Sequence, residues 1–368
     1  MSSADKTNGP QRRPSGMRTF IAIFLALHIP LFVYPVLRLC SWLDLSPLVT
    51  ALLLIPIASS QIVSRWLLRD VKRPLSRGLR HVADFILGLS PILLMTLLVF
   101  EFAVLLGLVG VWPAAVIVLG ISMTIALAGI LFALTTVVKK VTFESSLLTA
   151  PLRFVQITDV HIGSRSEAFL EQVIRKVHTL QPEFLCITGD FIDARGVVEE
   201  QLAALRTLEC PIYFTIGNHE RYEDLDEILA TMRALGVNTL RSGAIHHRED
   251  VQVLGIDDSD DARQVEQELV KMELDRQAFN VLLYHRPQGL EAVEASGIDL
   301  MISGHTHDGQ IFPFNLVVKR VFDRVAGMYQ LGGSRLYVSQ GTGTWGPVMR
   351  VGTRSEITLF EIEAIANQ

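Results

Sequence analysis

Long apolar stretches fill the first part of the chain, at residues 19–37, 46–64, 85–107 and 112–138. Each is long enough to cross about 30 Å of hydrocarbon as an α-helix that rises about 1.5 Å per residue. The first does not read as a cleaved signal peptide, because no small-x-small cleavage site follows it and three more apolar stretches come after it. The pattern therefore predicts four transmembrane helices over residues 18–138, preceded by a tail at 1–17.

After residue 152 the pattern changes to short apolar runs that alternate with amphipathic stretches, which is typical of an α/β domain. Helices are predicted at 166–180, 197–209 and 224–235, the last of them ending at Gly236. Strands are predicted at 153–158, 184–188, 211–216, 251–256, 281–284, 299–303, 335–339 and 355–361. We expect residues 139–151 to be a linker and residues 152–364 to form one domain with its own core.

Charged residues divide the chain into two parts. Residues 1–150 hold 13 Lys and Arg against 6 Asp and Glu, and residues 151–368 hold the remaining 20 against 32, so the formal charges are +7 and −12. The basic residues gather in the N-terminal tail, in the loop between the second and third apolar stretches, and at Lys139 and Lys140. Because cytoplasmic loops carry an excess of Lys and Arg, we expect a multi-pass protein of the cell (inner) membrane with its N-terminus and its second domain in the cytoplasm.

Composition excludes several classes of protein. A hydrophobic content of 49% is too high for a disordered chain. The three cysteines, Cys40, Cys186 and Cys210, form no CxxC motif, so neither a disulfide framework nor a thiolate zinc site is expected. The acidic domain lacks the basic surface that nucleic acids require, so no nucleic-acid partner is expected. Glu101 lies inside the third apolar stretch and leaves a transport pathway open as an alternative to a plain anchor.

Metal-binding residue types follow five of the predicted strands, at the point where each strand ends. These residues are Asp159, His161, Asp190, Asn218, His285, His305 and His307. Because ligands bind at the carboxyl ends of the strands in open α/β sheets, we expect the seven side chains to converge. A glycine precedes Asp190, Asn218 and His305, and we expect each glycine to let the backbone turn sharply.

The residue types indicate which metals such a site would take. Carboxylate, amide oxygen and imidazole without sulfur suit manganese, iron or zinc. Seven ligands are too many for one ion, whereas one shared carboxylate divides them into two sites of four. Two metals about 3.5–4 Å apart are a recurring device for in-line displacement at phosphorus. Two divalent ions, two aspartates and a bridging hydroxide leave a net charge of about +1, which favours an anionic substrate.

Five short motifs occur in order between residues 152 and 345. They are Asp-x-His (159–161), Gly-Asp-x-x-Asp (189–193), Gly-Asn-His-Glu (217–220), a lone His at a strand end (285) and Gly-His-Thr-His (304–307). In this order they resemble the calcineurin-like metallophosphoesterase superfamily. The extended last motif, Gly-His-Thr-His-Asp-Gly-Gln, is similar to the bacterial membrane-associated phosphodiesterase branch, in which a Gly usually stands at the position of Asp308.

The resemblance implies a two-sheet sandwich flanked by helices and a site for two divalent transition-metal ions (Mn, Fe or Zn). It implies that Asp159, His161, Asp190 and His307 hold one metal, and that Asp190, Asn218, His285 and His305 hold the other. A bridging hydroxide would attack phosphorus, and His219 would protonate or stabilise the leaving oxygen. Purple acid phosphatases have a Tyr at the position of Asp193, so a tyrosinate–iron site is not expected.

The sequence thus predicts a membrane-anchored, dinuclear metal-dependent phosphohydrolase that cleaves a phosphodiester or pyrophosphate bond. Anchoring favours a lipid-linked substrate over a soluble phosphorylated small molecule. Arginines beside the metal motifs are candidates for binding substrate phosphate, namely Arg165, Arg195, Arg221 and Arg286. The alternative is a membrane sensor or transporter whose domain binds metal without turnover, and the presence of His219 argues against it. The substrate, the native metals and the oligomeric state are left open.

Overall fold

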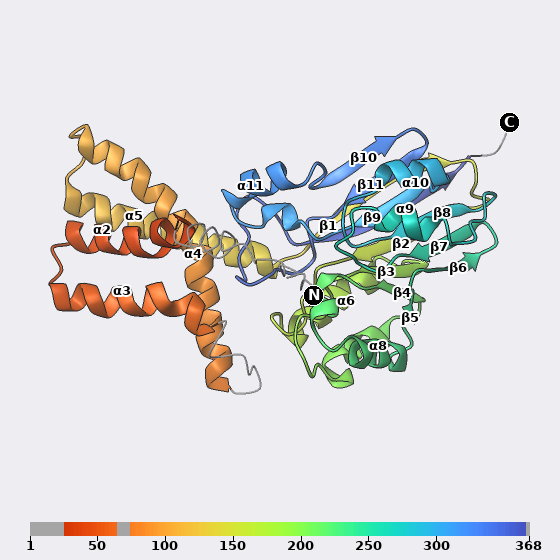
Figure 1. Cartoon of the computed structure of the whole chain (residues 1–368), viewed down its shortest axis with the longest axis horizontal. Coiled ribbons are helices and arrows are strands. Elements are labelled where there is room, and N and C mark those ends of the chain that lie inside the picture. The colour runs from red at the N-terminus through yellow and green to blue at the C-terminus, as the bar shows by residue number, and fades with distance from the viewer. Residues whose placement is uncertain (1–25, 65–73, 366–368) are drawn as a thin grey trace, which may run out of the picture. The chain divides into compact units, whose positions relative to one another are not determined.

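The computed structural model describes residues 26–64 and 74–365, and the chain divides into two compact units, Met1–Met123 and Thr124–Gln368 (Figure 1).

The first unit consists of apolar helices. They are the π-helical turn η1 (Ile29–Val33), α2 (Tyr34–Trp42), α3 (Pro47–Ile62), α4 (Pro74–Leu105) and the first part of α5 (Val111–Leu134). Inside this unit Glu101 of α4 pairs with Arg38 of α2 at 2.5 Å and accepts a hydrogen bond from the Tyr34 hydroxyl. The one acidic group predicted inside a span therefore has its charge matched by a neighbouring helix.

Two of the four predicted membrane spans have helices long and apolar enough to cross a membrane, α4 and α5. The helices over residues 26–42 and 47–62 are shorter, and α3, with 16 residues, is about 24 Å long at about 1.5 Å per residue. Residues 19–25 of the first predicted span lie outside the described residues. The four-helix membrane region is therefore not confirmed.

The predicted linker at 139–151 is wrong for its first half. The fourth helix ends at Leu134, and residues Val137–Ser145 form strand β1, which pairs in parallel with β12 (Glu356–Ala364) along its whole length. Val141 and Phe143 pack against the core between the sheets, which gives this segment a side to bury. The first residues of β1, Val137 and Val138, are apolar and follow directly on the apolar residues of α5. The sequence alone therefore did not show where the predicted membrane span ends and the strand begins.

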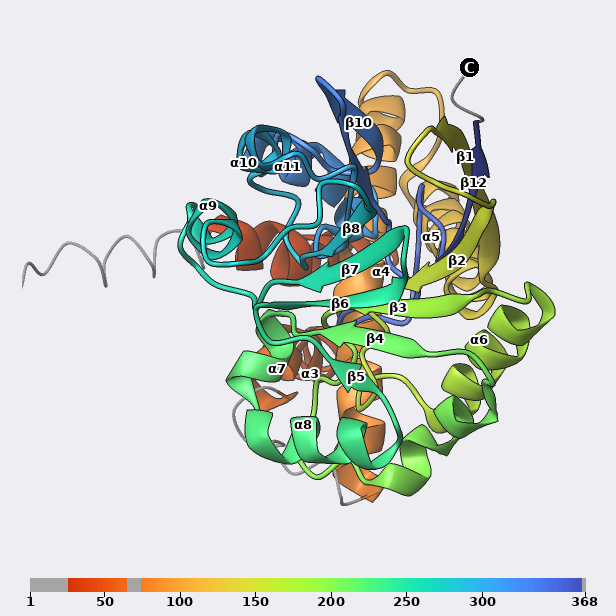
Figure 2. The ribbon, with the colours of Figure 1, turned by 90° about the vertical axis from the view of Figure 1, so that its right-hand side faces the viewer.

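The second unit is a sandwich of two mixed, six-stranded sheets (Figure 2). The first sheet has the order β1-β12-β2-β3-β4-β5, and the second has the order β10-β11-β9-β8-β7-β6. The other strands are β2 (Leu152–Ile157), β3 (Phe184–Thr188), β4 (Ile212–Thr215), β5 (Asn238–Thr239), β6 (Gly243–Arg248), β7 (Val251–Gly255), β8 (Phe279–Leu283), β9 (Leu300–Ser303), β10 (Gly327–Leu331) and β11 (Ser334–Val338). All eight predicted strands are present, whereas β1, β5, β6 and β10 were missed.

Aromatic residues fill the space between the sheets. Phe154 stacks on Phe184 and on Phe360 with ring centroids 4.7 Å apart in both pairs, and Phe279 of the second sheet belongs to the same buried cluster. Burial of such side chains away from water is worth about 1.5–3 kcal/mol each. This core fixes the two sheets against each other and therefore fixes the relative positions of the loops at their edges.

Helices cover the outer faces of the sandwich. The first sheet is covered by α6 (Glu167–Thr179), the 3-10 helix η3 (Glu199–Thr207) and α8 (Leu225–Ala234). The second sheet is covered by α9 (Gln264–Leu269) and α10 (Leu290–Ser296). The predicted two-sheet sandwich flanked by helices is confirmed, with the helix predicted at 197–209 adopting the tighter 3-10 form.

Candidate metal centre

The seven predicted ligands follow β2, β3 and β4 in the first sheet and β8 and β9 in the second; Asn218 is the first residue of the short helix α7 (Asn218–Tyr222), and His307 is the first residue of the 3-10 turn η4 (His307–Gly309). Backbone hydrogen bonds tie these segments together, from Asp159 N to Gly189 O (3.1 Å) and from Gly304 N to His285 O (2.9 Å). One bond crosses between the sheets, because the backbone N–H of His305 donates to the Asp159 carboxylate (3.1 Å). Six of the seven side chains are buried and His305 is half-buried, so the sandwich brings the whole predicted set together.

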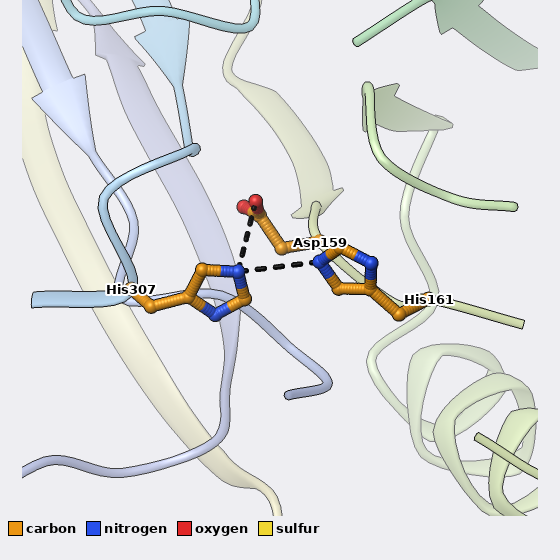
Figure 3. A group of neighbouring side chains, drawn as sticks. All are labelled: Asp159, His161 and His307. Atoms are coloured by element: carbon orange, nitrogen blue, oxygen red, sulfur yellow. Dashed lines mark hydrogen bonds and ion pairs between the residues drawn. The ribbon is translucent and has the colours of Figure 1, made fainter. Parts of the chain in front are cut away.

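One cluster contains Asp159, His161 and His307 (Figure 3). Nε2 of His307 lies 3.2 Å from Nε2 of His161 and 3.4 Å from Oδ1 of Asp159. On the far side of the His161 ring, Nδ1 lies 3.3 Å from Oδ2 of Asp193, and Oδ1 of Asp193 accepts a hydrogen bond from Ser164 N (2.8 Å). A carboxylate behind an imidazole in this way orients the opposite nitrogen toward a metal.

A second cluster contains Asp190, His285 and His305. Nε2 of His285 lies 3.2 Å from Oδ2 of Asp190 and 3.1 Å from Nδ1 of His305. The other nitrogen of His285, Nδ1, lies 2.9 Å from the carbonyl oxygen of Thr188. Since a carbonyl only accepts, Nδ1 carries the proton and donates, which leaves Nε2 to face the cluster.

The side chains present fit a pair of divalent cations. Oδ1 of Asn218 is buried and has no hydrogen-bond partner among the described residues, and the backbone N–H of the next residue, His219, donates to Oδ1 of Asp190 (2.8 Å). Two imidazole nitrogens that face each other at 3.2 Å, in His161 and His307, need a proton or a cation between them. Oxygen and imidazole donors without sulfur suit manganese, iron or zinc.

The protonation states of the protein groups are strongly coupled. Burial alone would raise the pKa of Asp190, but the charge of His285 holds it well below its usual range, and Asp190 in turn raises the pKa of His285 to about 10 despite burial. Burial lowers the pKa of His305 to about 3 and that of His307 well below its usual value, so both imidazoles are neutral ligands. Metal binding at the second cluster must therefore displace a proton from His285, which makes affinity rise with pH.

Unusual backbone conformations gather at this site. Asp159, His161, Asp190, His305 and His307 have φ between 48° and 73°, the left-handed region that non-glycine residues rarely adopt. Each such residue costs of the order of 1–3 kcal/mol and persists where the surrounding structure enforces it. The strain is concentrated on residues whose side chains must turn inward, which is a mark of a functional site.

The glycines before three of the ligands are needed for different reasons. Gly189 has a φ of 80°, as the turn prediction required. Gly217 and Gly304 do not have a positive φ; instead, a Cβ on Gly217 would lie 2.2 Å from Oδ1 of Asp190, and one on Gly304 would lie 2.1 Å from Oδ2 of Asp159. At these two positions the prediction named the right residue but gave the wrong reason. Glycine is needed there because a carboxylate approaches the backbone closely, and not because the backbone turns with a positive φ.

Glu220 is a functional residue that sequence reasoning missed. Its buried carboxylate accepts four backbone N–H bonds, from Asp190 (3.0 Å), Phe191 (2.7 Å), Ile192 (2.9 Å) and Gly217 (2.8 Å). Burial, followed by the charge of Asp190, raises the pKa of Glu220 to about 7. The signal was present in the Gly-Asn-His-Glu motif, but only the structure shows that its last residue fixes two ligand loops.

Arg350 is a second missed residue, and nothing in the sequence singles it out. Its buried guanidinium donates to the carbonyls of Gln340 (2.6 Å), Gly341 (3.0 Å) and Gly343 (2.8 Å), and Nη2 lies 3.5 Å from Nδ1 of His307. Its own backbone N–H donates to Gly129 O in α5 (2.9 Å). Arg350 therefore ties the loop around His307 to the end of a long apolar helix.

His219 stands beside both clusters. Its ring is 4.8 Å from the ring of His161, and Nε2 lies 4.0 Å from Oδ2 of Asp190. With 23% of its side chain exposed, it faces the open side of the site, unlike the buried groups around it. Burial of most of the ring lowers the pKa of His219.

The four arginines predicted to bind phosphate differ in what they contact. Arg165 is buried, donates to Thr344 Oγ1 (3.3 Å) and Ala133 O (3.2 Å), and lies over the Phe169 ring, so its guanidinium holds parts of the fold together; a substrate role for it stays a prediction. Arg195 is exposed and pairs with Glu223 at 3.1 Å.

Arg221 and Arg286 form one network with two aspartates. Arg221 lies 2.7 Å from Asp258 and 2.9 Å from Asp260, and Arg286 lies 2.6 Å from each of them. A substrate role for Arg195, Arg221 and Arg286 stays a prediction. Asp308, the residue after the ligand His307, has a φ of 48°, a left-handed conformation that glycine adopts without strain.

Comparisons with known proteins agree with this chemistry. The family model described as calcineurin-like phosphoesterase matches residues 152–309. An uncharacterized metallophosphoesterase of Aquifex aeolicus is 30% identical over 244 residues, which cover 62% of this chain and 93% of that protein. Another from Campylobacter jejuni is 33% identical over 241 residues, covering 62% of this chain and 64% of that protein.

A Bos taurus relative is named transmembrane protein with metallophosphoesterase domain. It is 32% identical over 238 residues, which cover 58% of this chain and 53% of that protein. The chain thus spans between half and two thirds of the length of the Campylobacter and Bos taurus relatives. With its ordered motifs, its paired clusters of ligands and these matches, the chain belongs to the calcineurin-like metallophosphoesterase family.

Proposed function

We propose that this protein is a membrane-anchored, dinuclear metal-dependent phosphohydrolase that cleaves a phosphodiester or pyrophosphate bond of a lipid-linked substrate. The observation that carries the proposal is the adjacency of two buried clusters of ligands, Asp159–His161–His307 and Asp190–His285–His305. The hydrogen bond from His305 N to Asp159 holds the two clusters in one place. The family uses a dinuclear divalent metal centre, and these residues provide two adjacent sets of donors for it.

The residues divide into holders of metal and a proton donor. Asp159, His161, Asp190 and His307 would hold one cation, and Asp190, Asn218, His285 and His305 the other. When bound, two divalent cations supply a water of lowered pKa and positive charge for the phosphate oxygens. His219 faces the open side of both clusters and donates a proton to the leaving oxygen, and the hydrogen bond from its own backbone N–H to Asp190 (2.8 Å) fixes its position.

Membrane anchoring is supported by the long apolar helices α4 and α5 and by the name of the Bos taurus relative. We extend this to four spans with the catalytic domain in the cytoplasm, because 12 of the 13 basic residues of the first 150 positions lie in the tail, in the loop between the second and third apolar stretches, or just after the last span, and Arg38 is the exception. An anchored site meets lipid-borne phosphate more often than soluble phosphate, which is the basis for a lipid-linked substrate.

The test uses purified full-length protein loaded with Mn²⁺ and a panel of phosphomonoesters, phosphodiesters and nucleotide-linked lipids. We expect His219→Ala to keep both metals and to lower turnover by about 10²-fold or more, since general acid catalysis contributes about 10²–10⁴-fold. Asp190→Asn should lose metal and activity together. Unchanged hydrolysis in His219→Ala would refute the proton-donor role, and metal binding without turnover of any substrate would support a non-catalytic sensor domain instead.

A further inference from the structure

Helix α11 (Phe314–Val321) lies outside the two sheets of the second unit (Figure 1), and most of its apolar side chains are exposed. The helix has no buried residue, and Leu316, Val317 and Val321 are 54%, 57% and 69% exposed. Phe312 and Phe314 at its start are also exposed. We call Phe312 and the apolar residues of α11 the α11 patch. Large apolar side chains gathered on a surface mark a contact with another apolar phase or protein.

The charge around the α11 patch indicates what covers it. Lys319 and Arg320 are exposed within the same helix, although the second part of the chain carries a formal charge of −12. An apolar helix face with basic residues beside it is the arrangement of helices that lie in the interface of a lipid bilayer. Anionic headgroups attract such basic residues, whereas in a symmetric dimer through this helix the basic residues of two α11 patches would face and repel each other.

The α11 patch is continuous with the end of a candidate membrane span. Residues 124–134 of α5 belong to the same compact unit as α11. Gly129 lets α5 approach so closely that a Cβ there would lie 2.8 Å from Met349 and 3.0 Å from Val351. Val351 in turn bonds to the chain just before α11, through Val351 N to Gln310 O (3.0 Å) and Phe312 N to Val351 O (2.9 Å).

Polar contacts make the end of α5 a fixed part of this unit. The carbonyl of Ala133 accepts hydrogen bonds from Arg165 (3.2 Å) and from Ser355 Oγ (3.1 Å), and Arg354 lies over the Phe132 ring at 3.6 Å. Cations at a helix C-terminus are favourable because of the helix dipole. The second unit is therefore held at the C-terminal end of α5. The α11 patch is near this end, because Phe312 of the patch is hydrogen-bonded to Val351, and Val351 packs against Gly129 of α5.

The α11 patch also adjoins the metal centre. The 3-10 turn η4 (His307–Gly309) carries a ligand and is separated from α11 by four residues. At the other end of the helix, the Phe322 ring lies 5.5 Å from the ring of the ligand His305. Both ends of α11 are thus attached to the loop that carries His305 and His307.

We propose that the α11 patch lies in the interface of an anionic lipid bilayer and brings the metal centre to the level of the headgroups. The inference rests on the membrane attachment proposed above and deepens it, because it names the surface by which a lipid-borne phosphate reaches the site. Interfacial helices of this type bury their apolar face about 5–10 Å into the boundary between headgroups and acyl chains. The metal ligands next to α11 then face phosphate at that boundary.

A photocrosslinking experiment tests the contact directly. Full-length protein carrying a benzoylphenylalanine at Val317 is placed in nanodiscs of phosphatidylcholine and phosphatidylglycerol, illuminated and analysed by mass spectrometry. Val270, a valine that is 84% exposed next to α9, carries the same group in the matched control. We expect lipid adducts at 317 and none at 270. No lipid adduct at 317, equal adducts at both positions, or a crosslink from 317 to a second copy of the chain would overturn the proposal.

A charge reversal tests its consequence for catalysis. In Lys319→Glu/Arg320→Glu, we expect the ratio of hydrolysis of a phosphodiester lipid in anionic vesicles to hydrolysis of bis(p-nitrophenyl) phosphate to fall at least threefold. Arg175→Glu, at an exposed arginine of α6, should leave this ratio unchanged. An unchanged ratio in the double variant would contradict the α11 patch as an anionic-membrane contact. If the unsubstituted protein hydrolysed neither substrate, the proposed function would be contradicted instead. The crosslinking experiment would then still show whether the α11 patch contacts lipid.

Discussion

Replacement of Glu220 by Gln tests whether the metal ligands depend on the carboxylate that lies behind them. Oε1 of Glu220 accepts from the N–H groups of Phe191 and Ile192, and Oε2 accepts from those of Asp190 and Gly217. A carboxylate only accepts, whereas an amide has one oxygen and one NH₂ group. Whichever way the substituted amide is turned, its NH₂ group faces two backbone donors.

The expected magnitude follows from this geometry. Two buried backbone donors lose their acceptor, and each costs about 1–3 kcal/mol, so the free energy of unfolding should fall by about 2–6 kcal/mol. For a domain of this size about 1 kcal/mol corresponds to about 2–4 °C in Tm, which gives a decrease of about 4–24 °C. Because the four donors belong to the loops of Asp190 and Asn218, metal affinity at the second cluster should fall as well.

The assay is thermal unfolding of the full-length protein in detergent at pH 8.5, above the pKa of about 7 of Glu220, so that the carboxylate is ionised. A chelator is present, because bound metal would itself stabilise the folded state. Glu209→Gln, at an exposed glutamate, is the matched control and should leave Tm unchanged. A Tm for Glu220→Gln within 1 °C of the unsubstituted protein, together with a full metal content by elemental analysis of a separate sample without chelator, would refute the reasoning.

Two further substitutions probe the fold around the site. Burial raises the pKa of Asp250, but hydrogen bonds from Thr149 N (2.6 Å) and Oγ1 (2.7 Å) together with the ion pair to Arg248 (2.6 Å) lower it overall. The ionised form of Asp250 therefore stabilises the fold above the unfolded value of 3.8, and this effect is lost as pH falls through the folded pKa. Asp250→Asn should therefore lower Tm at pH 7, with the difference shrinking toward pH 3; a difference independent of pH would contradict this account. Gly304→Ala would place a Cβ 2.1 Å from Oδ2 of Asp159, so we expect loss of metal by elemental analysis, whereas Gly333→Ala, with open space around the added carbon, should retain it. Full metal content in Gly304→Ala would contradict this prediction and show that the loop around residue 304 can shift to accommodate the added carbon.

The secondary structure of the second unit could be predicted well because its strands are buried on both faces. Continuous apolar runs such as 184–188 and 299–303 mark such strands, and the ends of the runs located the ligands. Strands with mixed patterns escaped, as β6 and β10 are largely exposed. β1 escaped because its first residues continued the apolar run of α5, and only pairing with β12 makes them a strand.

The candidate site was predictable for residues whose type names their chemistry, and less so for residues whose role depends on contacts. An Asp or His after a strand suggests a ligand wherever it occurs. Glu220 and Arg350 could not be found in this way, because a buried carboxylate or guanidinium acts through whatever backbone groups surround it. Arg165 shows the converse. Its position beside a motif in the sequence suggested a phosphate contact, whereas in the structure its buried guanidinium donates hydrogen bonds to Thr344 Oγ1 and Ala133 O.

By itself, the sequence determined the family, the sandwich and the set of candidate ligand residues, because these depend on local patterns of burial and on side-chain chemistry. The tertiary structure decided which candidate ligands share a cluster, which backbone positions are forced into left-handed conformations, and that α5 packs against residues 349–351, of which Arg350 contacts His307. The physical reason is that these features arise from contacts between segments more than a hundred residues apart, such as His305 with Asp159 and Arg350 with Gly129, and no local pattern encodes them.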